Sequence, residues 1–189
     1  MKIELATNEE IEKLYAKYKK FNTHLLENPK EIFPFLGIMD VYNRVLTEQE
    51  AQDLLGYEQH NLRYGSRFLT AIIQMYHKDD ELFAYFNKKA VSKAEFKFIL
   101  SSLNRMEARI FRKIFATNKG IYKIGDKEAL EFLVNLSIKE LYFVDFFFPS
   151  LETILVGNYE LCFPIYSKTK AGFEQCREII ELNELFIRE

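Results

Sequence analysis

The chain has 189 residues, of which 48% are apolar, 15% aromatic and 29% charged, and its net charge is −2. This composition is that of a folded globular protein and excludes an extended disordered chain, because only 7 Gly and 4 Pro are present. The length suits one hydrophobic core, so we expect residues 1–189 to form a single domain.

The sequence carries no signal for export or membrane insertion. Met1-Lys2-Ile3-Glu4 is not followed by an apolar stretch of the signal-peptide kind, and no apolar run is long enough to cross a bilayer. We therefore expect a cytoplasmic protein without a membrane partner. Cys162 and Cys176 lack a CxxC spacing, and we expect packed free thiols rather than a disulfide.

Three capping boxes predict helix starts in the first half of the chain. They pair Thr7 with Glu10, Thr47 with Glu50, and Ser92 with Glu95. In each box the hydroxyl accepts from the N3 amide, and the carboxylate accepts from the N-cap amide. The first helix carries an apolar stripe at helical spacing and is expected to end near Asn28-Pro29.

The remainder of residues 1–119 is also expected to be helical. Residues 32–37 are apolar but interrupted by Pro34, which predicts a short helix or turn. Helical spacing then marks residues 62–76, and Asp79 or Asp80 is expected to cap a continuation that contains Leu82, Phe83 and Phe86. A single helix is expected over residues 92–117.

The pattern changes after Gly120. A short β-prone run at 121–124 precedes a helix over 126–135, which Asp126 is expected to cap. Strand candidates follow at 138–148, 151–156 and 159–166, then a helix from Thr169 or Lys170, and a last strand at 185–187. The order from residue 121 is β-α-β-β-β-α-β. We therefore predict an α+β fold, with a helical N-terminal part (1–119) packed on a small, mainly antiparallel sheet (120–189).

Two local features predict details of that sheet. Gly157-Asn158 lies between two β-prone runs and predicts a two-residue hairpin, with Gly supplying the positive φ of a type II′ turn. Pro164 cannot donate to a β-ladder, so its strand is expected at a sheet edge or bulge.

Motifs for catalysis and for cofactor or metal binding are missing from the sequence. The glycines form no phosphate-binding or nucleophile-elbow pattern, and the three histidines are far apart in sequence. We expect no catalytic residue, no metal site, no cofactor and no enzymatic activity.

Two carboxylates stand in apolar surroundings. Glu107 falls within the apolar stripe of the 92–117 helix, and Asp145 lies among aromatic neighbours. Because an unpaired buried charge is unfavourable, each is expected to pair with Arg63, Arg67 or a Tyr hydroxyl; Asp145 could also be a solvent-facing charge that prevents aggregation. An enzyme site built from Glu107, Asp145 and tyrosines is a third, less favoured functional hypothesis.

The charges are unevenly distributed along the chain. Residues 88–123 contain ten Lys and Arg against two Glu, whereas residues 124–189 contain six against twelve Asp and Glu. A helical wheel places one basic face, with an aromatic residue, on the 92–117 helix: Phe98, Arg105, Arg109, Arg112 and Lys113. Such a face could bind nucleic acid. A solvated face, or one that docks the acidic C-terminal part, is favoured over this alternative.

The C-terminal part resembles a known group of proteins. The aromatic run at 139–152, the Gly-Asn segment at 157–166 and the closing helix are similar to the C-terminal portion of small bacterial immunity proteins. These proteins are the cognate inhibitors of polymorphic and contact-dependent growth-inhibition toxins.

The resemblance implies a cytosolic protein that binds a toxin domain, often a nuclease, and blocks its active site or its access to substrate. An acidic C-terminal part suits a basic nuclease cleft, because complementary charge accelerates association. The acidic residues that this interpretation selects for toxin binding are Asp126, Glu128, Glu131, Glu152 and Glu160.

Overall fold

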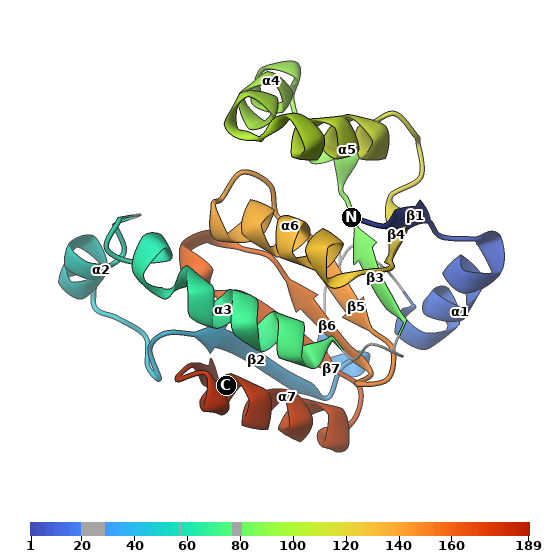
Figure 1. Ribbon diagram of the computed structural model, residues 1–189. Helices are drawn as coiled ribbons and strands as arrows, with labels where there is room; N and C mark the ends of the chain where they lie inside the picture. The colour runs from blue at the N-terminus through green and yellow to red at the C-terminus, as the bar shows by residue number, and fades with distance from the viewer. Residues whose placement is uncertain (20–28, 57, 77–80) are drawn as a thin grey trace.

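The computed structural model describes residues 1–19, 29–56, 58–76 and 81–189. The expected α+β class is confirmed, since helices pack on one antiparallel sheet (Figure 1). The helices are α1 (Asn8–Tyr18), α2 (Glu48–Leu54), α3 (Asn61–Met75), α4 (Lys93–Ser102), α5 (Arg105–Phe115), α6 (Lys127–Ile138) and α7 (Lys170–Leu182). Short 3-10 helices are η2 (Pro29–Glu31), η3 (Lys88–Ala90) and η4 (Tyr159–Leu161).

The strands of the described residues form one eight-stranded sheet in which every neighbouring pair is antiparallel. They are β1 (Ile3–Leu5), β2 (Phe35–Asp40), β3 (Leu82–Tyr85), β4 (Ile121–Ile124), β5 (Asp145–Phe148), β6 (Thr153–Val156), β7 (Phe163–Ser167) and β8 (Phe186–Arg188). Their spatial order is β1-β4-β3-β5-β6-β7-β2-β8. From residue 121 onward, the predicted order β-α-β-β-β-α-β is confirmed.

The expectation that residues 1–119 are helical is wrong in three places. β1, β2 and β3 come from this part of the chain, and β2 and β3 are inner strands of the sheet. Of residues 32–37, expected as a helix or turn, Phe35, Leu36 and Gly37 form the first half of β2, and Leu82 and Phe83 lie in β3. Both strands obtain their partners from distant sequence: β2 pairs with β7 and β8, and β3 pairs with β4 and β5.

Side chains alternate between two cores, as the two-residue period of a strand requires. In β5, Phe146 and Phe148 join the larger core beneath α3, α6 and α7, whereas Phe147 joins the smaller core with α1. Figure 1 shows α3, α6 and α7 in front of the sheet and α1 at its right-hand end. Because both faces are covered, all four residues of β5 are buried.

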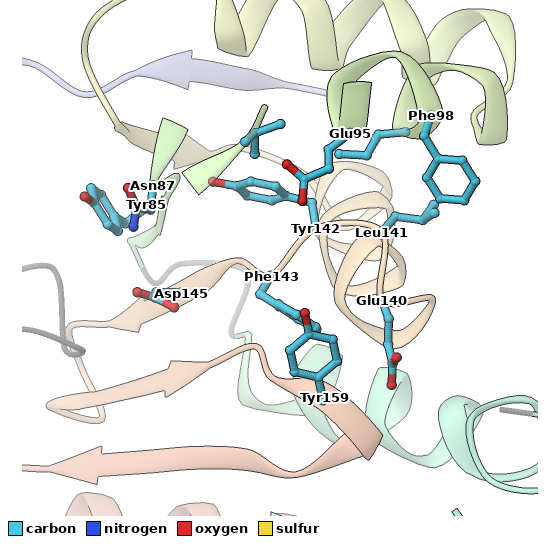
Figure 2. A pocket seen from close by; sticks show the side chains of 12 residues that line it. Tyr85, Asn87, Glu95, Phe98, Glu140, Leu141, Tyr142, Phe143, Asp145 and Tyr159 are labelled. Carbon is cyan, nitrogen blue, oxygen red and sulfur yellow. The ribbon is translucent and has the colours of Figure 1, made fainter. Parts of the chain in front are cut away.

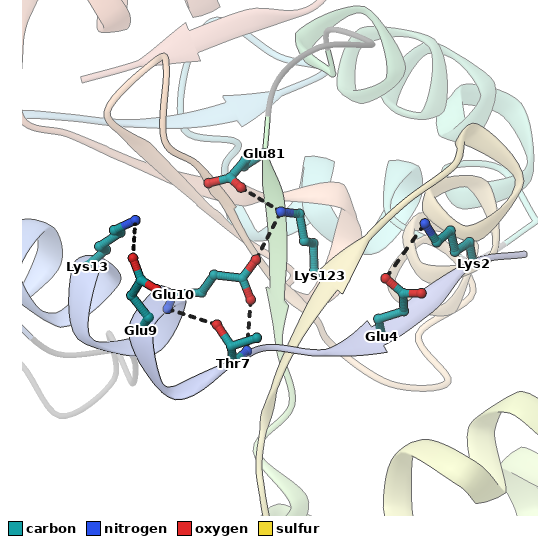
Figure 3. Close-up of polar contacts among 8 residues, drawn as sticks. All are labelled: Lys2, Glu4, Thr7, Glu9, Glu10, Lys13, Glu81 and Lys123. Atoms are coloured by element: carbon teal, nitrogen blue, oxygen red, sulfur yellow. Dashed lines mark hydrogen bonds and ion pairs between the residues drawn. The ribbon is translucent and has the colours of Figure 1, made fainter.

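The three predicted capping boxes are confirmed at α1, α2 and α4. At α1, Glu10 also accepts from Lys123 of β4 (2.9 Å), and Lys123 reaches Glu81 at 2.5 Å (Figure 3). This ion-pair network joins the start of α1 to the β3–β4 region. Thr169 caps α7 and Asp126 caps α6, as expected.

The expected single helix over residues 92–117 is instead two helices. α4 ends at Ser102, and Asn104 caps α5 through hydrogen bonds from the amides of Met106 (2.9 Å) and Glu107 (3.0 Å). Together α4 and α5 form a helical hairpin between β3 and β4, drawn above the sheet in Figure 1. We call residues 93–115 the α4–α5 hairpin.

Both predictions about the segment after β6 are wrong. Gly157 does not have a positive φ, and no two-residue turn forms, because η4 lies between β6 and β7. The positive φ angles fall on Glu160 and Leu161 instead. Pro164 is not on an edge strand: β7 lies between β6 and β2, with Pro164 just beyond the β6 pairing, which ends at Ile165.

The expected strand over 138–148 begins only at Asp145, because α6 continues to Ile138. Cys162 and Cys176 are free thiols, as expected. The predicted helix end near Asn28 and the caps at Asp79 or Asp80 lie outside the described residues. Within the described ranges, no helix is long and apolar enough to cross a membrane.

Candidate functional site

A pocket of about 450 Å³ lies where the α4–α5 hairpin meets the sheet. Its wall is built from the end of β3, from α4, from the connection between α6 and β5, and from η4 (Figure 2). Its volume lies in the range of small-molecule sites, roughly 300–1,000 Å³. The hairpin leaves the sheet after Tyr85 and places α4 opposite residues 140–143, so the fold itself creates this space.

Aromatic rings form much of the pocket. Phe143 and Tyr159 pack edge to face, with ring centroids 4.5 Å apart and planes at 71°. Tyr159 is 61% exposed and Phe98 is 64% exposed, so two large aromatic side chains face solvent beside the pocket. Exposed aromatic residues around a concavity are typical of binding surfaces, where they supply most of the contact energy.

Asp145 lies in the pocket wall and is only 6% exposed. Burial raises the pKa of Asp145 to about 8, because the charged form loses its hydration. Among the described residues, no ion pair or hydrogen bond of its carboxyl group is found. The expected pairing with Arg63 or Arg67 is wrong, because Arg67 pairs with Glu184 at 2.7 Å and Arg63 lies over the Tyr64 ring.

Tyr142 lies in the same wall and is 7% exposed. Its ring stacks on Phe86, with centroids 5.7 Å apart and planes at 17°. Burial raises the pKa of Tyr142, and the nearby Asp145 carboxyl adds to that rise. Its hydroxyl makes no hydrogen bond of ordinary geometry within the described part of the chain. A buried hydroxyl without a partner is unfavourable unless a ligand or water satisfies it.

Glu140 and Glu95 also lie in the pocket wall. Glu140 accepts from the Asn61 side-chain amide (2.9 Å) and from the Glu160 backbone N–H (2.8 Å). The Ser92 hydroxyl and N–H hold the pKa of Glu95 below its usual value. The described residues that line the pocket include these two carboxyl groups and Asp145 but no Lys, Arg or His, so the ionisable groups of the wall, apart from tyrosine phenols, are all carboxyl groups.

The five predicted toxin-binding acids do not form one surface. Asp126 caps α6 and accepts from the Lys2 N–H at 2.6 Å, Glu128 pairs with the N-terminal ammonium at 2.7 Å, and Glu131 pairs with Lys127 at 3.6 Å. Glu152 lies elsewhere, 3.4 Å from Lys17. Of the five, Glu160 is nearest to the pocket, because it follows Tyr159 and its N–H binds Glu140.

The predicted basic face is divided by the break between α4 and α5. Phe98 lies on α4 beside the pocket, whereas Arg105, Arg109, Arg112 and Lys113 lie on α5. These four cations are exposed, and no ion pair links them to an acid in the described ranges, so they do not dock the acidic C-terminal part.

The position of Glu107 near the start of α5 explains its carboxylate. Its carboxylate accepts from the Asn104 N–H at 2.9 Å and so completes the α5 capping box. Glu107 is not among the residues that line the pocket with Asp145, so that pocket does not bring together the two carboxyl groups of the enzyme hypothesis. Within the described residues, no group of three or more His, Cys, Asp or Glu is placed to hold a metal ion.

Sequence reasoning singled out Asp145 and Phe98 but missed Tyr85, Glu140, Tyr142 and Tyr159 as site residues. One signal was present: Asp145 interrupts an aromatic run that also contains Tyr142 and Phe143.

Comparison of the chain with protein-family models, with curated proteins and with solved structures produces no match. The fold and the pocket together define an α+β protein with a pocket lined by carboxyl groups and aromatic rings.

Proposed function

We propose that this chain is an immunity-type protein of the bacterial cytoplasm, which binds and neutralises a cognate toxin domain of the nuclease type, without catalytic activity or a cofactor of its own. The observation that carries the proposal is the pocket rim, where exposed Phe98 and Tyr159 stand beside Glu95, Glu140 and Glu160. Aromatic anchors provide contact energy, and acidic neighbours select a basic partner such as a nuclease cleft.

The resemblance of residues 139–189 to immunity proteins supports the same function. The pocket refines which acidic residues take part. We propose Glu160 as the contact of the original five, because Asp126, Glu128, Glu131 and Glu152 each have a cationic neighbour within the chain. Complementary charge would then act mainly at the pocket rim rather than along the whole C-terminal part.

The experiment is growth rescue in a bacterial host that expresses the toxin domain encoded by the neighbouring gene. Co-expression of the wild-type chain should restore growth, and the two proteins should co-purify. The Phe98→Ala, Tyr159→Ala double variant should fail to rescue, whereas Leu182→Ala, which alters an 80% exposed side chain on α7, should rescue normally. Failure of the wild-type chain to bind the toxin domain would refute the proposal.

A second function, nucleic-acid binding, is favoured by one observation: the four cations of α5 are exposed and have no acidic partner among the described residues. Arg105, Arg109 and Arg112 recur at helical spacing, so they form one stripe that could follow a phosphate backbone.

Fluorescence anisotropy with labelled RNA and DNA at low and high salt tests this function. Binding through the stripe should weaken steeply with salt, and Arg109→Ala with Arg112→Ala should reduce that salt dependence. Arg44→Ala is the matched control, because Arg44 lies outside the hairpin and pairs with Glu50. Absence of binding at low salt would remove this alternative.

A further inference from the structure

The pocket between the α4–α5 hairpin and the sheet has a chemistry that selects among ligand classes. Its wall carries the carboxyl groups of Asp145, Glu95 and Glu140 and no basic side chain. These carboxyl groups would repel an anionic ligand, and none of the described residues that line the pocket is a cation that could neutralise them. The electrostatics therefore favour a positively charged ligand.

Two of the three carboxylates are already engaged. Glu140 accepts from Asn61 and Glu160, and Glu95 accepts from the Ser92 N–H at 2.7 Å. Asp145, in contrast, is more than nine-tenths buried and makes no ion pair or hydrogen bond with the residues that the structure describes. Tyr142 adds a second buried polar group: its hydroxyl makes no hydrogen bond of ordinary geometry among the described residues, although the Asn87 backbone partly offsets the rise of its pKa. A buried carboxyl group and a buried hydroxyl that line the same pocket can both be satisfied by a polar ligand.

The rest of the wall distinguishes an organic cation from a metal ion. Tyr85, Tyr142, Phe143 and Tyr159 present aromatic rings, and these attract guanidinium and alkylammonium groups through their negative faces (Figure 2). A volume of about 450 Å³ far exceeds the space of a bare ion. The described residues also provide no cluster of three potential metal ligands.

We infer that this pocket binds an organic cation, a guanidinium or alkylammonium group, whose charge meets Asp145 and whose carbon chain packs against the surrounding aromatic rings. The group could belong to a free small molecule or to an arginine or lysine side chain of a protein partner. In the second case, the inference rests on the proposed function and gives the toxin an anchor residue.

Protonation of the Asp145 carboxyl group should make the affinity of the pocket for a cation depend on pH. Burial raises the pKa of Asp145 to about 8, so the carboxyl group holds its proton at neutral pH and releases it when a cation binds. The other titratable groups around the pocket are Glu95, Glu140 and the phenols of Tyr85, Tyr142 and Tyr159, with Tyr166 also close enough to Asp145 to be affected. Affinity should rise by up to about tenfold per pH unit as pH approaches 8, and then level off.

The test is a calorimetric titration of the full chain with n-butylguanidinium, compared with n-butylurea, which has a similar shape but no charge. We expect the cation to bind at least about tenfold more tightly than the urea, and more tightly at pH 8 than at pH 6.5. Asp145→Asn should abolish this preference for charge. Tyr159→Ala, which removes an exposed ring, should weaken binding of the cation without affecting folding.

Equal binding of the two compounds, no binding of the cation, or an unchanged preference in Asp145→Asn would each overturn the inference. Titration of the same variants with the toxin domain distinguishes failure of the cation site from failure of the proposed immunity function. If n-butylguanidinium binds and no toxin domain does, the cation site stands and the immunity function falls. If the toxin domain binds and n-butylguanidinium neither binds nor competes, the immunity function stands and the cation site falls.

Discussion

Asp145 is the register partner of Tyr85 in the antiparallel pairing of β3 with β5, so a buried carboxyl group and a phenol ring lie side by side at the end of two inner strands. Cross-strand partners share one face of a sheet. Burial raises the pKa of Tyr85, and the charge of Asp145 adds to the rise. This pair lies where the sheet meets the pocket, and its protonation links the stability of the fold to the chemistry of the site.

The first prediction concerns the pH dependence of stability in Asp145→Asn. The pKa of Asp145 rises from 3.8 to about 8 on folding, so between these values the folded chain holds a proton that the unfolded chain releases. Stability therefore falls as pH increases across this window, by at most about 1.4 kcal/mol per pH unit. The neighbouring phenols of Tyr85 and Tyr166 do not titrate in this pH range, because burial raises their pKa values as well.

Asparagine has no proton to release, so the free energy of unfolding of Asp145→Asn minus that of the wild type should increase from pH 5 to pH 8. Urea denaturation at both pH values measures the difference. Glu178→Gln, which removes one exposed carboxylate from α7, matches the change in net charge. A difference that stays constant from pH 5 to pH 8 would show that Asp145 is not protonated by burial.

The second prediction concerns Lys88, which anchors the α4–α5 hairpin. Its ammonium group donates to the carbonyl oxygens of Ile114, Thr117 (2.8 Å) and Lys119 (2.5 Å), and to the Tyr122 hydroxyl (3.0 Å). A cation at the end of α5 also interacts favourably with the helix dipole. Lys88→Met leaves these acceptors without their donor and should lower the free energy of unfolding by about 2 kcal/mol.

Lys89→Met is the control, because Lys89 is the next residue and its side chain is exposed. Urea denaturation should separate the two variants clearly. Hydrogen exchange should also show faster exchange in the α4–α5 hairpin of Lys88→Met than in α3 or α7. Equal stability of the two variants would mean that Lys88 does not hold the hairpin in place.

The third prediction concerns Gly157, where a close approach of two chain segments, rather than a positive φ, requires glycine. A Cβ atom there would lie 2.5 Å from the Ser137 hydroxyl and 3.0 Å from the backbone N and O of Val144. Because backbone atoms cannot easily move aside, Gly157→Ala should destabilise the fold by about 2 kcal/mol. The strain would fall on Val144, the residue before Asp145.

Gly56→Ala is a matched substitution, since a Cβ atom at Gly56 would meet nothing within 4 Å and the residue has no positive φ. Thermal unfolding of the two variants should show a lower midpoint for Gly157→Ala alone. A midpoint for Gly157→Ala equal to that of Gly56→Ala would indicate that the backbone around Val144 adapts without cost.

Sequence motifs that lie within one helical turn predicted the starts of helices well. The capping boxes that begin at Thr7, Thr47 and Ser92 start helices because each depends only on residues within one turn. The α5 start was missed because its cap is Asn104, paired with Glu107, and an apolar stripe continued across the break. The wheel drawn through that break placed Phe98 with the arginines, although they belong to different helices.

Strands β2 and β3 could not be recognised in the same way. Leu82, Phe83 and Phe86 suit helical spacing, and only pairing with β4 and β5 makes β3 a strand. The pocket depends on the same distant pairings, since Tyr85, Glu95, Glu140 and Tyr159 come from four separate segments of the chain. Asp145 was identified as unusual from its neighbours in sequence, but its partners in space follow from the sheet order.

The fourth prediction tests binding through the pocket rim most directly. The measurement is the dissociation constant for the toxin domain of the neighbouring gene, determined for Glu160→Lys and Glu152→Lys. Glu160 is exposed at the pocket rim, whereas Glu152 is already paired with Lys17 at 3.4 Å. We predict that Glu160→Lys weakens binding by about tenfold or more and that Glu152→Lys has a much smaller effect. Wild-type affinity in Glu160→Lys, with loss of binding in Glu152→Lys, would contradict a binding surface at the pocket.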